Sequence, residues 1–448
     1  MNNKIDILLA YPKPTDDSPV KLTPLSILYP GAFFESQGKT VAYFDERFDP
    51  PEMLDELIKD SKEIGVSAFT GFQVGHAANI LQRAKQLNPS IITGVGGYHP
   101  RTVGKDEVMA EPFVDKVWME RTYGEDLFPY NEKTKILFER TEMQYFTSRG
   151  CPYPCSFCAL RSPWEPQDVK RLERQLKTIH NDIGFKEISF SDPNIGFERY
   201  KDDDGKTQRL DRVKRINDIG QILRDIDVRW DGNIRSPYLT PEMVEILVES
   251  NCFSIEIGCE SGNDHFLKKI IRKGHGVDKI KQAAKNIKGS GISVMYSFIA
   301  NMPRETPEML SETFDLIDWI VDTDPDARVS MYNYAPYPGS PMYDDAVNGV
   351  EGFPKFTPPK TMEGWGKLRL MVSPIYWIVG LNFRMDNTRK NFPGKDWVKI
   401  EPYVNLAREK WRKREVDEFP CAEVEALVAE QVRTSNLQAS MFLAETGV

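Results

Sequence analysis

The stretch SRGCPYPCSFC, from Ser148 to Cys158, carries three cysteines in the spacing C-x3-C-x2-C. Thiolates are soft ligands that favour iron, and so short a spacing lets one loop present Cys151, Cys155 and Cys158 to the same cluster. Three protein ligands leave the fourth iron of a cubane open to a substrate or cofactor. A structural zinc site is a weaker interpretation, because it requires a fourth Cys or His and the nearest histidine, His180, is distant in sequence. A chance grouping of buried or redox-active thiols is the remaining alternative.

Around this motif, apolar runs typical of strands alternate with amphipathic helical stretches such as Pro241–Ser250 and Glu308–Asp322. The six predicted strands are Met143–Cys151, Glu187–Asp192, Val228–Arg235, Ser254–Ser261, Ser293–Ala300 and Arg328–Pro336. Six β/α units within about 200 residues are typical of a partial (β/α) barrel, in which the chemistry lies at the carboxyl ends of the strands.

The preceding residues show the same alternation and predict a separate α/β domain. Its predicted strands are Ile5–Pro12, Lys39–Glu46, Ile64–Gly71, Ile91–Pro100 and Val114–Met119. Strict alternation of strand and helix indicates a doubly wound, Rossmann-like parallel sheet. Ligands of such sheets bind beyond the carboxyl ends of the strands. This places Pro12, the corner formed by Gly71, Phe72 and Gln73, and the loop from Gly94 to His99 at the binding edge.

Composition limits the class of protein. The chain has 448 residues, of which 40% are hydrophobic and 28% charged, and its formal net charge is −9. These values are typical of a folded, multidomain protein, and the acidic balance disfavours a nucleic acid as partner. We predict three parts: residues 1–140, 141–345 and 346–448.

Six cysteines in so long a chain, without a charged-then-apolar leader at the start, predict a reduced, cytoplasmic protein. The longest apolar run, Leu370–Phe383, is too short to span a bilayer and contains Pro374, so no membrane span is expected. The last 100 residues lose the β/α alternation and predict a mainly helical extension. Its aromatic residues either cap a substrate pocket or simply pack, packing being the simpler interpretation: Trp365, Tyr376, Trp377, Phe383, Trp397 and Tyr403.

The motif Ser148–Cys158 at the head of a β/α series resembles the radical S-adenosylmethionine (radical SAM) superfamily. The resemblance implies that Cys151, Cys155 and Cys158 ligate a [4Fe–4S] cluster whose open iron chelates SAM. It also implies that Phe157 lies against the adenine, with an ordinary core aromatic as the alternative. It also implies that an electron from the cluster cleaves SAM to a 5′-deoxyadenosyl radical, and that a reducing partner such as flavodoxin or ferredoxin supplies this electron.

Further segments extend the resemblance from Met143 to about Tyr343. By position they imply SAM contacts from the ends of four strands and from the turn after the last one: Ser191, Asp192, Arg235, Glu260, Ile299, Asn301 and Tyr337. Asn301 stands where the family usually has glycine. Structural ion pairs are the alternative for Arg235 and Glu260.

The segments Leu22–Asp45 and Gly94–Pro100 are similar to the cobalamin-binding domain fused to many radical SAM enzymes. The similarity implies cobalamin at the binding edge, near these residues: Pro12, Gly71, Phe72, Gln73, Gly96, Gly97 and His99. No D-x-H-x-x-G sequence is present, so a histidine ligand below the cobalt is not expected. His76 and His99 are either metal ligands or, more simply, hydrogen-bonded loop residues. The turn Glu120–Asp126 differs from the acidic turn that is usual in the family. A domain that has lost its cobalamin is therefore an alternative.

Three functions follow from these resemblances. The first is methylation of an unactivated carbon of a small molecule through methylcobalamin. The second is a cobalamin-free radical reaction, namely dehydration, epimerisation, cyclisation or oxidation of a sugar, lipid or tetrapyrrole, in which Tyr296, Tyr332 and Tyr334 near strand ends quench or steer the radical. The third is an iron–sulfur scaffold or sensor, which the matches along the barrel disfavour. Methylthiotransferases that modify tRNA share the cysteine spacing, but they carry further cluster cysteines in a region where this chain has none, residues 1–142.

Overall fold

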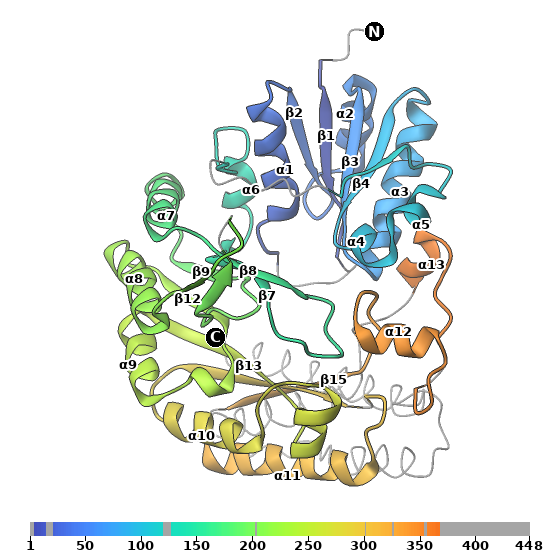
Figure 1. Ribbon diagram of the computed structural model, residues 1–448. Coiled ribbons are helices and arrows are strands. Elements are labelled where there is room, and N and C mark those ends of the chain that lie inside the picture. Colours follow the sequence, from blue (N-terminus) through green and yellow to red (C-terminus); the bar gives the residue numbers. More distant parts are fainter. Residues whose placement is uncertain are drawn as a thin grey trace, which may run out of the picture. The chain divides into compact units, whose positions relative to one another are not determined.

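The computed structural model describes residues 4–14, 21–119, 127–201, 204–300, 302–324, 327–353 and 356–367. The chain divides into two compact units (Figure 1). Within the described residues, the first unit comprises the chain up to Pro152 together with 156–232 and 336–367. The second comprises Tyr153–Cys155 and Asn233–Ala335. None of the helices in these ranges is long and apolar enough to cross a membrane.

A five-stranded parallel sheet of order β2-β1-β3-β4-β5 forms the amino-terminal part of the first unit. Its strands are β1 (Ile7–Tyr11), β2 (Val41–Asp45), β3 (Glu63–Ala68), β4 (Ile92–Gly97) and β5 (Lys116–Val117). The connecting helices are α1 (Leu25–Ser36), α2 (Pro51–Asp60), α3 (Phe72–Leu87), α4 (His99–Val103) and α5 (Lys105–Met109). The predicted doubly wound arrangement is therefore confirmed.

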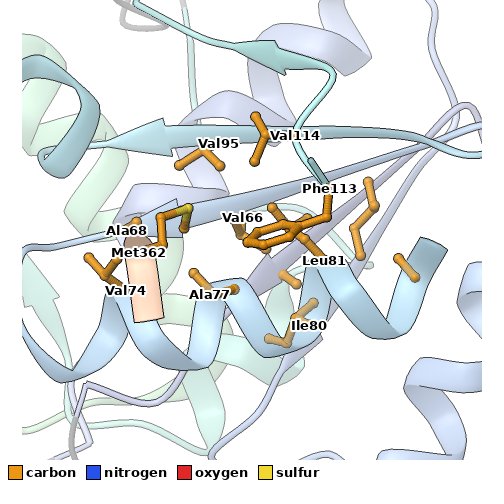
Figure 2. Packing of buried hydrophobic residues seen from close by; sticks show 14 of the residues in the cluster. Val66, Ala68, Val74, Ala77, Ile80, Leu81, Val95, Phe113, Val114 and Met362 are labelled. Atoms are coloured by element: carbon orange, nitrogen blue, oxygen red, sulfur yellow. The ribbon is translucent and has the colours of Figure 1, made fainter. Parts of the chain in front are cut away.

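Each face of this sheet has its own apolar core, because side chains alternate along a strand. Ile7 and Leu9 of β1 pack with Phe34 of α1 on one face. On the other face, Val66 and Val95 pack against the stripe of α3 that contains Ala77 and Leu81 (Figure 2). Both faces are buried, as expected for a parallel sheet.

A short helix from the end of the described chain completes the second of these cores. Helix α13 (Met362–Lys367) buries Met362 and Trp365, each 2% exposed, among the residues of α3, β3 and β4. The two backbones come so close that a Cβ on Gly366 would lie 2.5 Å from the Cα of Gly75. Trp365 therefore packs in the amino-terminal core, which agrees with the simpler of its two interpretations. The other aromatic residues named for the extension lie outside the described residues.

Truncation of Trp365 will destabilise the amino-terminal domain. We expect Trp365→Ala to lower the free energy of unfolding by about 3–5 kcal/mol, because the indole is fully packed and leaves a cavity. Urea unfolding followed by far-UV circular dichroism measures this loss. Trp319→Ala, which truncates a partly exposed tryptophan of the second unit, should cost clearly less. Equal losses of unfolding free energy in the two variants would show that the burial of Trp365 adds no more stability than that of a partly exposed tryptophan.

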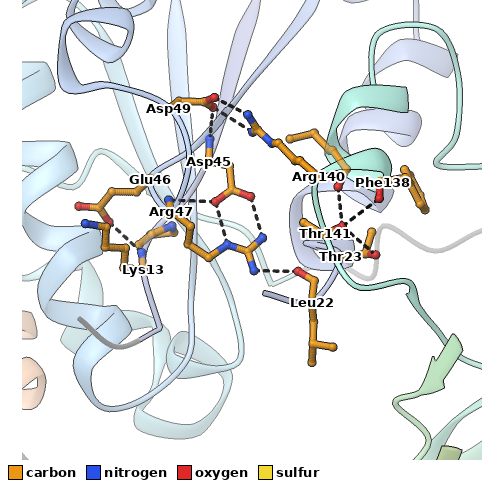
Figure 3. A network of polar contacts seen from close by, with 12 residues as sticks. Lys13, Leu22, Thr23, Asp45, Glu46, Arg47, Asp49, Phe138, Arg140 and Thr141 are labelled. Carbon is orange, nitrogen blue, oxygen red and sulfur yellow. Dashed lines mark hydrogen bonds and ion pairs between the residues drawn. The ribbon is translucent and has the colours of Figure 1, made fainter. Parts of the chain in front are cut away.

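A polar network ties β2 to the segment that leads into the barrel (Figure 3). Arg47 holds the carboxylate of Asp45 with two hydrogen bonds of 2.9 and 2.7 Å and donates to the carbonyl of Leu22. Arg140, which follows α6 (Lys135–Glu139), makes bonds of 2.5 and 3.1 Å to Asp49. These charge-assisted pairs fix the junction after the first domain.

The first unit also holds the beginning of the barrel. Strands β6 (Gln144–Tyr145), β9 (Glu187–Phe190) and β12 (Arg229–Asn233) run parallel, with α7 (Val169–Ile183) and α8 (Arg212–Asp225) as crossovers. Asp168 and Asp211 cap the two helices by accepting hydrogen bonds from backbone N–H groups. A small hairpin of β10 (Arg199–Lys201) and β11 (Thr207–Arg209) is inserted before α8.

The structure corrects the prediction of one continuous strand over Met143–Cys151. After β6 the chain leaves the parallel ladder, and β7 (Ser148–Cys151) pairs antiparallel with β8 (Ser162–Pro166). Gly150 makes this possible, since its φ is 77° and a Cβ there would lie 1.9 Å from the carbonyl oxygen of Pro163. The cysteine loop is thereby the tip of a hairpin.

The second unit contains the remaining predicted strands. The parallel strands β13 (Cys252–Glu260), β14 (Ser293–Ala300) and β15 (Arg328–Asn333) are adjacent in that order. Their helices are α9 (Pro241–Glu249), α10 (Val277–Ile287) and α11 (Pro307–Thr323), with the short turns η1 (Ser236–Tyr238) and η2 (Phe266–Ile270). Thr240 and Thr306 cap α9 and α11 through their side-chain oxygens. Helix α12 (Pro341–Val347) returns to the first unit.

Candidate active site

The cysteine loop supplies the donor set of an iron–sulfur cluster. Cys151 ends β7, Cys155 is 6% exposed, and the backbone N–H of Leu160 donates to Sγ of Cys158 at 3.4 Å. All five described cysteines are thiols. Across the described ranges, no three His, Cys, Asp or Glu side chains converge on the position of a single metal ion. Three thiols in one loop fit a [4Fe–4S] cluster, in which each thiolate ligates its own iron.

A buried carboxylate fixes the strand that leads into this loop. Asp192, fully buried after β9, accepts hydrogen bonds from the backbone N–H and hydroxyl of Thr147, at 2.7 and 2.8 Å, and from the hydroxyl of Ser148 at 2.5 Å. Burial raises its pKa, and these donors oppose the rise. Protein donors thus reach both oxygens of Asp192. Its predicted role at SAM, like that of the exposed Ser191, stays a prediction.

Arg235 and Glu260 meet at a residue that the sequence did not single out, Lys273. Nζ of Lys273 lies 2.5 Å from Oε1 of Glu260, and both side chains are more than nine-tenths buried. Arg235 donates to the backbone carbonyl of Lys273, and its guanidinium stacks 3.7 Å from the ring centre of Tyr153 in the cysteine loop. Glu260 ends β13 with a φ of 67°, a conformation that costs energy in a non-glycine residue. The charged residues around Gly274, in the loop after η2, were the sequence signal that could have indicated Lys273.

The predicted radical-steering tyrosines separate onto different faces of the second unit. Tyr296 is fully buried, and its register partners are Ile257 and Val329, both buried core residues. This placement on the helix-covered face argues against contact with a substrate radical. Tyr332 pairs in register with Ile299 on the opposite face, and both are partly exposed. These two residues and the partly exposed Tyr334 keep their roles as predictions, whereas Asn301 lies outside the described residues.

The carboxyl edge of the amino-terminal sheet, which we define by Pro12, Phe69–Gln73 and Gly96–His99, is shaped by its own hydrogen bonds. Gln73 donates to the carbonyl of Pro12 at 2.9 Å and accepts from the N–H of Phe69 at 2.9 Å. Gly71 turns the chain with a φ of 111° before Phe72, the first residue of α3. Gln73 is 5% exposed, so it braces the corner from within.

The two candidate histidines of this domain are both hydrogen-bonded. His99 is 1% exposed, contacts the hydroxyl of Thr70 at 3.0 Å through Nδ1, and lies edge-on to Trp365. Burial lowers the pKa of His99 to about 4, so the ring is neutral at pH 7. His76 contacts Oε1 of Glu46 at 3.1 Å. These contacts agree with the simpler interpretation of both residues.

Three aromatic rings lie together at the carboxyl edge. The sequence did not indicate Phe69 or Tyr98, and it assigned Tyr337 to SAM alone. Phe69 is 43% exposed and stacks on Tyr98 at a centroid distance of 5.3 Å, while Tyr337 lies 6.4 Å from Phe69. The hydroxyl groups of Tyr98 and Tyr337 are buried without a hydrogen-bond partner. Burial raises the pKa of Tyr98, and the side chain of Cys158 adds to the rise. A Cβ on Gly339 would lie 3.2 Å from Cγ2 of Thr102 in α4 and 3.7 Å from Cβ of Ala159, so the carboxyl edge is near Cys158 within the first unit.

Gly97 allows a close approach at this edge. Its φ is 90°, and a Cβ there would lie 2.8 Å from the carbonyl oxygen of Ala68 on the neighbouring strand. Glycine beside the exposed ring of Phe69 and the partly buried rings of Tyr98 and Tyr337, with unsatisfied hydroxyl groups, suits a large planar ligand that also accepts hydrogen bonds. The residues present therefore fit cobalamin.

Two family profiles match the chain. The radical SAM superfamily matches residues 145–317, and the B12 binding domain matches residues 15–129. The chain therefore carries a radical SAM domain and an amino-terminal B12-binding domain. It is therefore a radical SAM enzyme, and its cofactors are a [4Fe–4S] cluster, SAM and cobalamin. The predicted family, fold class and cofactors are confirmed, whereas the predicted domain limits stay predictions.

Several known proteins are similar to this chain, which spans less than half the length of the first of them. An uncharacterized methyltransferase of Pyrococcus horikoshii is 27% identical over 45% of this chain and 41% of its own length. The bacteriochlorophyllide d C-12(1)-methyltransferase of Chlorobaculum tepidum is 22% identical over 78% of this chain and 87% of its own length. The solved structure of the cobalamin-dependent SAM radical enzyme OxsB with aqua-cobalamin and SAM superposes with a TM-score of 0.61 at 15% identity, covering 96% of this chain and 75% of OxsB. The structural likeness shows the fold.

The buried histidine of the carboxyl edge predicts a loss of stability in mild acid. The pKa of His99 is about 4 in the folded protein and about 6.5 in an unfolded chain, so the unfolded state binds more protons as the pH falls from 6.5 to 4. We expect His99 to account for a loss of about 2 kcal/mol in the free energy of unfolding between pH 7 and pH 5. Urea unfolding of the apoprotein at both values measures it. His99→Gln should lose less over the same interval, and an unchanged loss would contradict the assignment.

Proposed function

We propose that the protein methylates an unactivated carbon of a small molecule, with cobalamin as the methyl carrier. The observation that carries this proposal is the close packing at Gly339, which contacts both α4, at the carboxyl edge of the B12-binding domain, and Ala159, the residue after Cys158. Methyl transfer through cobalamin requires the two cofactor sites to be close. The names of the two curated relatives above, both methyltransferases, support the same activity.

The chain's own residues would bind and orient the three cofactors. When bound, the cluster supplies the electron that cleaves SAM, and cobalamin carries the methyl group. Cys151, Cys155 and Cys158 would hold the cluster. Lys273 neutralises Glu260 and, through its backbone carbonyl, positions Arg235, so that a polar part of SAM meets one fixed guanidinium. At the carboxyl edge, the stacked rings of Phe69 and Tyr98 would exclude water from a bound corrin.

We also propose a cytoplasmic location and a reducing partner such as flavodoxin or ferredoxin. The five described cysteines are thiols, as expected in a reducing compartment. Cleavage of SAM at the cluster consumes an electron, which a small reductive carrier supplies.

The decisive experiment follows the methyl group. Anaerobically reconstituted protein is incubated with hydroxocobalamin, desalted, and supplied with a reductant and SAM labelled with ¹³C in its methyl group. We expect a retained corrin spectrum and ¹³C-methyl in the extracted corrinoid. Production of 5′-deoxyadenosine with no retained corrin would instead favour a cobalamin-free radical reaction and overturn the proposal.

A further inference from the structure

Strands β13, β14 and β15 have one apolar and one polar face. Ile255 and Ile257 of β13 pair in register with Val294 and Tyr296 of β14, and all four are buried. The alternate residues form the other face and are mainly polar or small: Ser254, Glu256, Gly258, Ser293, Met295, Ser297, Arg328 and Ser330. In a (β/α) barrel the face away from the helices is the interior, which side chains such as Val, Ile and Leu usually fill. This interior face is unusually polar.

The register leaves room on the interior face above Glu256. Gly258, Ser297 and Ser330 are adjacent in the ladder, so three small residues form the layer that follows Glu256 toward the carboxyl ends. A Cβ on Gly258 would meet Oε1 of Glu260 at 2.5 Å and Nζ of Lys273 at 2.8 Å. The Glu260–Lys273 pair therefore folds over Gly258 and bounds the next layer.

The carboxylate of Glu256 has few partners for its position. Ser297 donates a hydrogen bond to Oε1 of Glu256, and the Ser297 hydroxyl lies 3.0 Å from that of Ser330. Among the described residues, no Lys, Arg or His side chain lies within 4.0 Å of the Glu256 carboxylate. Burial and the charge of Glu260 raise the pKa of Glu256, although the side chain keeps an exposed surface in mid-strand. An exposed carboxylate on the interior face, with Ser297 as its described hydrogen-bond donor, favours a cationic partner.

Among the residues that the structure describes, the cations near Glu256 are already engaged. Lys273 is paired with Glu260 at 2.5 Å. Arg328 donates to the hydroxyl of Ser254, one layer toward the amino ends of the strands, at 2.8 Å. Arg328 lowers the pKa of Glu256 from beyond ion-pairing distance, and this effect is smaller than that of burial. An anionic group in this layer would face two carboxylates.

We propose that Glu256, with Ser297 and Ser330, forms a substrate subsite that binds a protonated amine. The inference rests on the proposed function, because it names the substrate class of that enzyme. The carboxylate accepts a charge-assisted hydrogen bond from the ammonium group, and Ser330 accepts a second one while Ser297 donates to Glu256. Glu256 is thus a binding residue that fixes one end of the substrate on the floor of the interior.

Binding of small probes tests this subsite without turnover. Butylamine, 1-butanol and butyrate share a four-carbon size and differ in charge. We expect saturation-transfer NMR with the cluster-loaded, SAM-bound protein to detect butylamine and not butyrate. Glu256→Gln, which keeps the shape and removes the charge, should weaken butylamine binding about tenfold. Glu245→Gln, on the exposed face of α9, is the matched control and should leave binding unchanged.

Each outcome is decisive. Butylamine binding that survives Glu256→Gln, or butyrate binding at least as strongly, overturns the proposed subsite. Cluster absorbance and the thermal midpoint verify that each variant is folded and loaded. Because the readout needs neither cobalamin nor methyl transfer, failure of the proposed methyltransferase activity would appear only in the labelling experiment, and failure of the subsite only here.

Discussion

Replacement of Cys155 by alanine will abolish reductive cleavage of SAM. The loop offers three thiolates, and a four-iron cluster held by three protein ligands already has one open iron. Loss of Cys155 opens a second iron, so the cluster is no longer held as a cubane with a single site for SAM. We expect the broad cluster absorbance to fall sharply after anaerobic reconstitution, and 5′-deoxyadenosine to drop to background in the presence of reductant.

Cys252→Ala is the matched control, because Cys252 and Cys155 are equally buried, at 6% exposure each. The two substitutions remove the same atoms from similar packing, and only one removes a predicted ligand. Cys252→Ala should keep its iron content and SAM cleavage. Retained cleavage in Cys155→Ala would contradict the cluster assignment, and loss in both variants would point to folding rather than ligation.

Local patterns predicted the elements well, since alternation and spacing are properties of neighbouring residues. The five strands of the amino-terminal sheet and the barrel strands all occur near their predicted positions. The hairpin of β7 and β8 was missed because Gly150 and the hydrogen bonds of Asp192 end the parallel pairing that begins at β6. Tyr296 shows that nearness to a strand end is not enough to assign a function to a residue. Its position was right, but only the register shows which face the side chain occupies.

Contacts between residues that are separated in sequence account for the other differences between the predictions and the structure. Nothing in the order of residues indicates that Trp365 belongs to a core built by α3 and β4, or that Lys273 pairs with Glu260. Tyr98 was inside a quoted glycine-rich loop, but its importance follows from the stacked Phe69 and from Cys158 nearby. The sequence therefore predicted which loops carry the site, and the structure adds the residues that brace them.

Gly97→Ala will weaken retention of cobalamin by about tenfold or more. The φ of Gly97 is 90°, and the new methyl group would lie 2.8 Å from the carbonyl oxygen and 2.9 Å from the nitrogen of Ala68. Both are backbone atoms, so the ends of β3 and β4 must separate, and the loop that carries Tyr98 and His99 must move with them. Absorbance of the bound corrin after desalting measures the loss.

Gly104→Ala separates this effect from backbone strain alone. Gly104 has a φ of 113°, yet nothing lies within 4 Å of a Cβ built there. Both substitutions force alanine into a conformation that favours glycine, and only Gly97→Ala also collides with a neighbouring strand. If the two variants lose corrin equally, strain explains the result and the carboxyl edge loses its assignment. If Gly97→Ala alone loses corrin while its cluster absorbance is unchanged, the edge binds cobalamin independently of the cysteine loop, as two separate cofactor sites in one enzyme require.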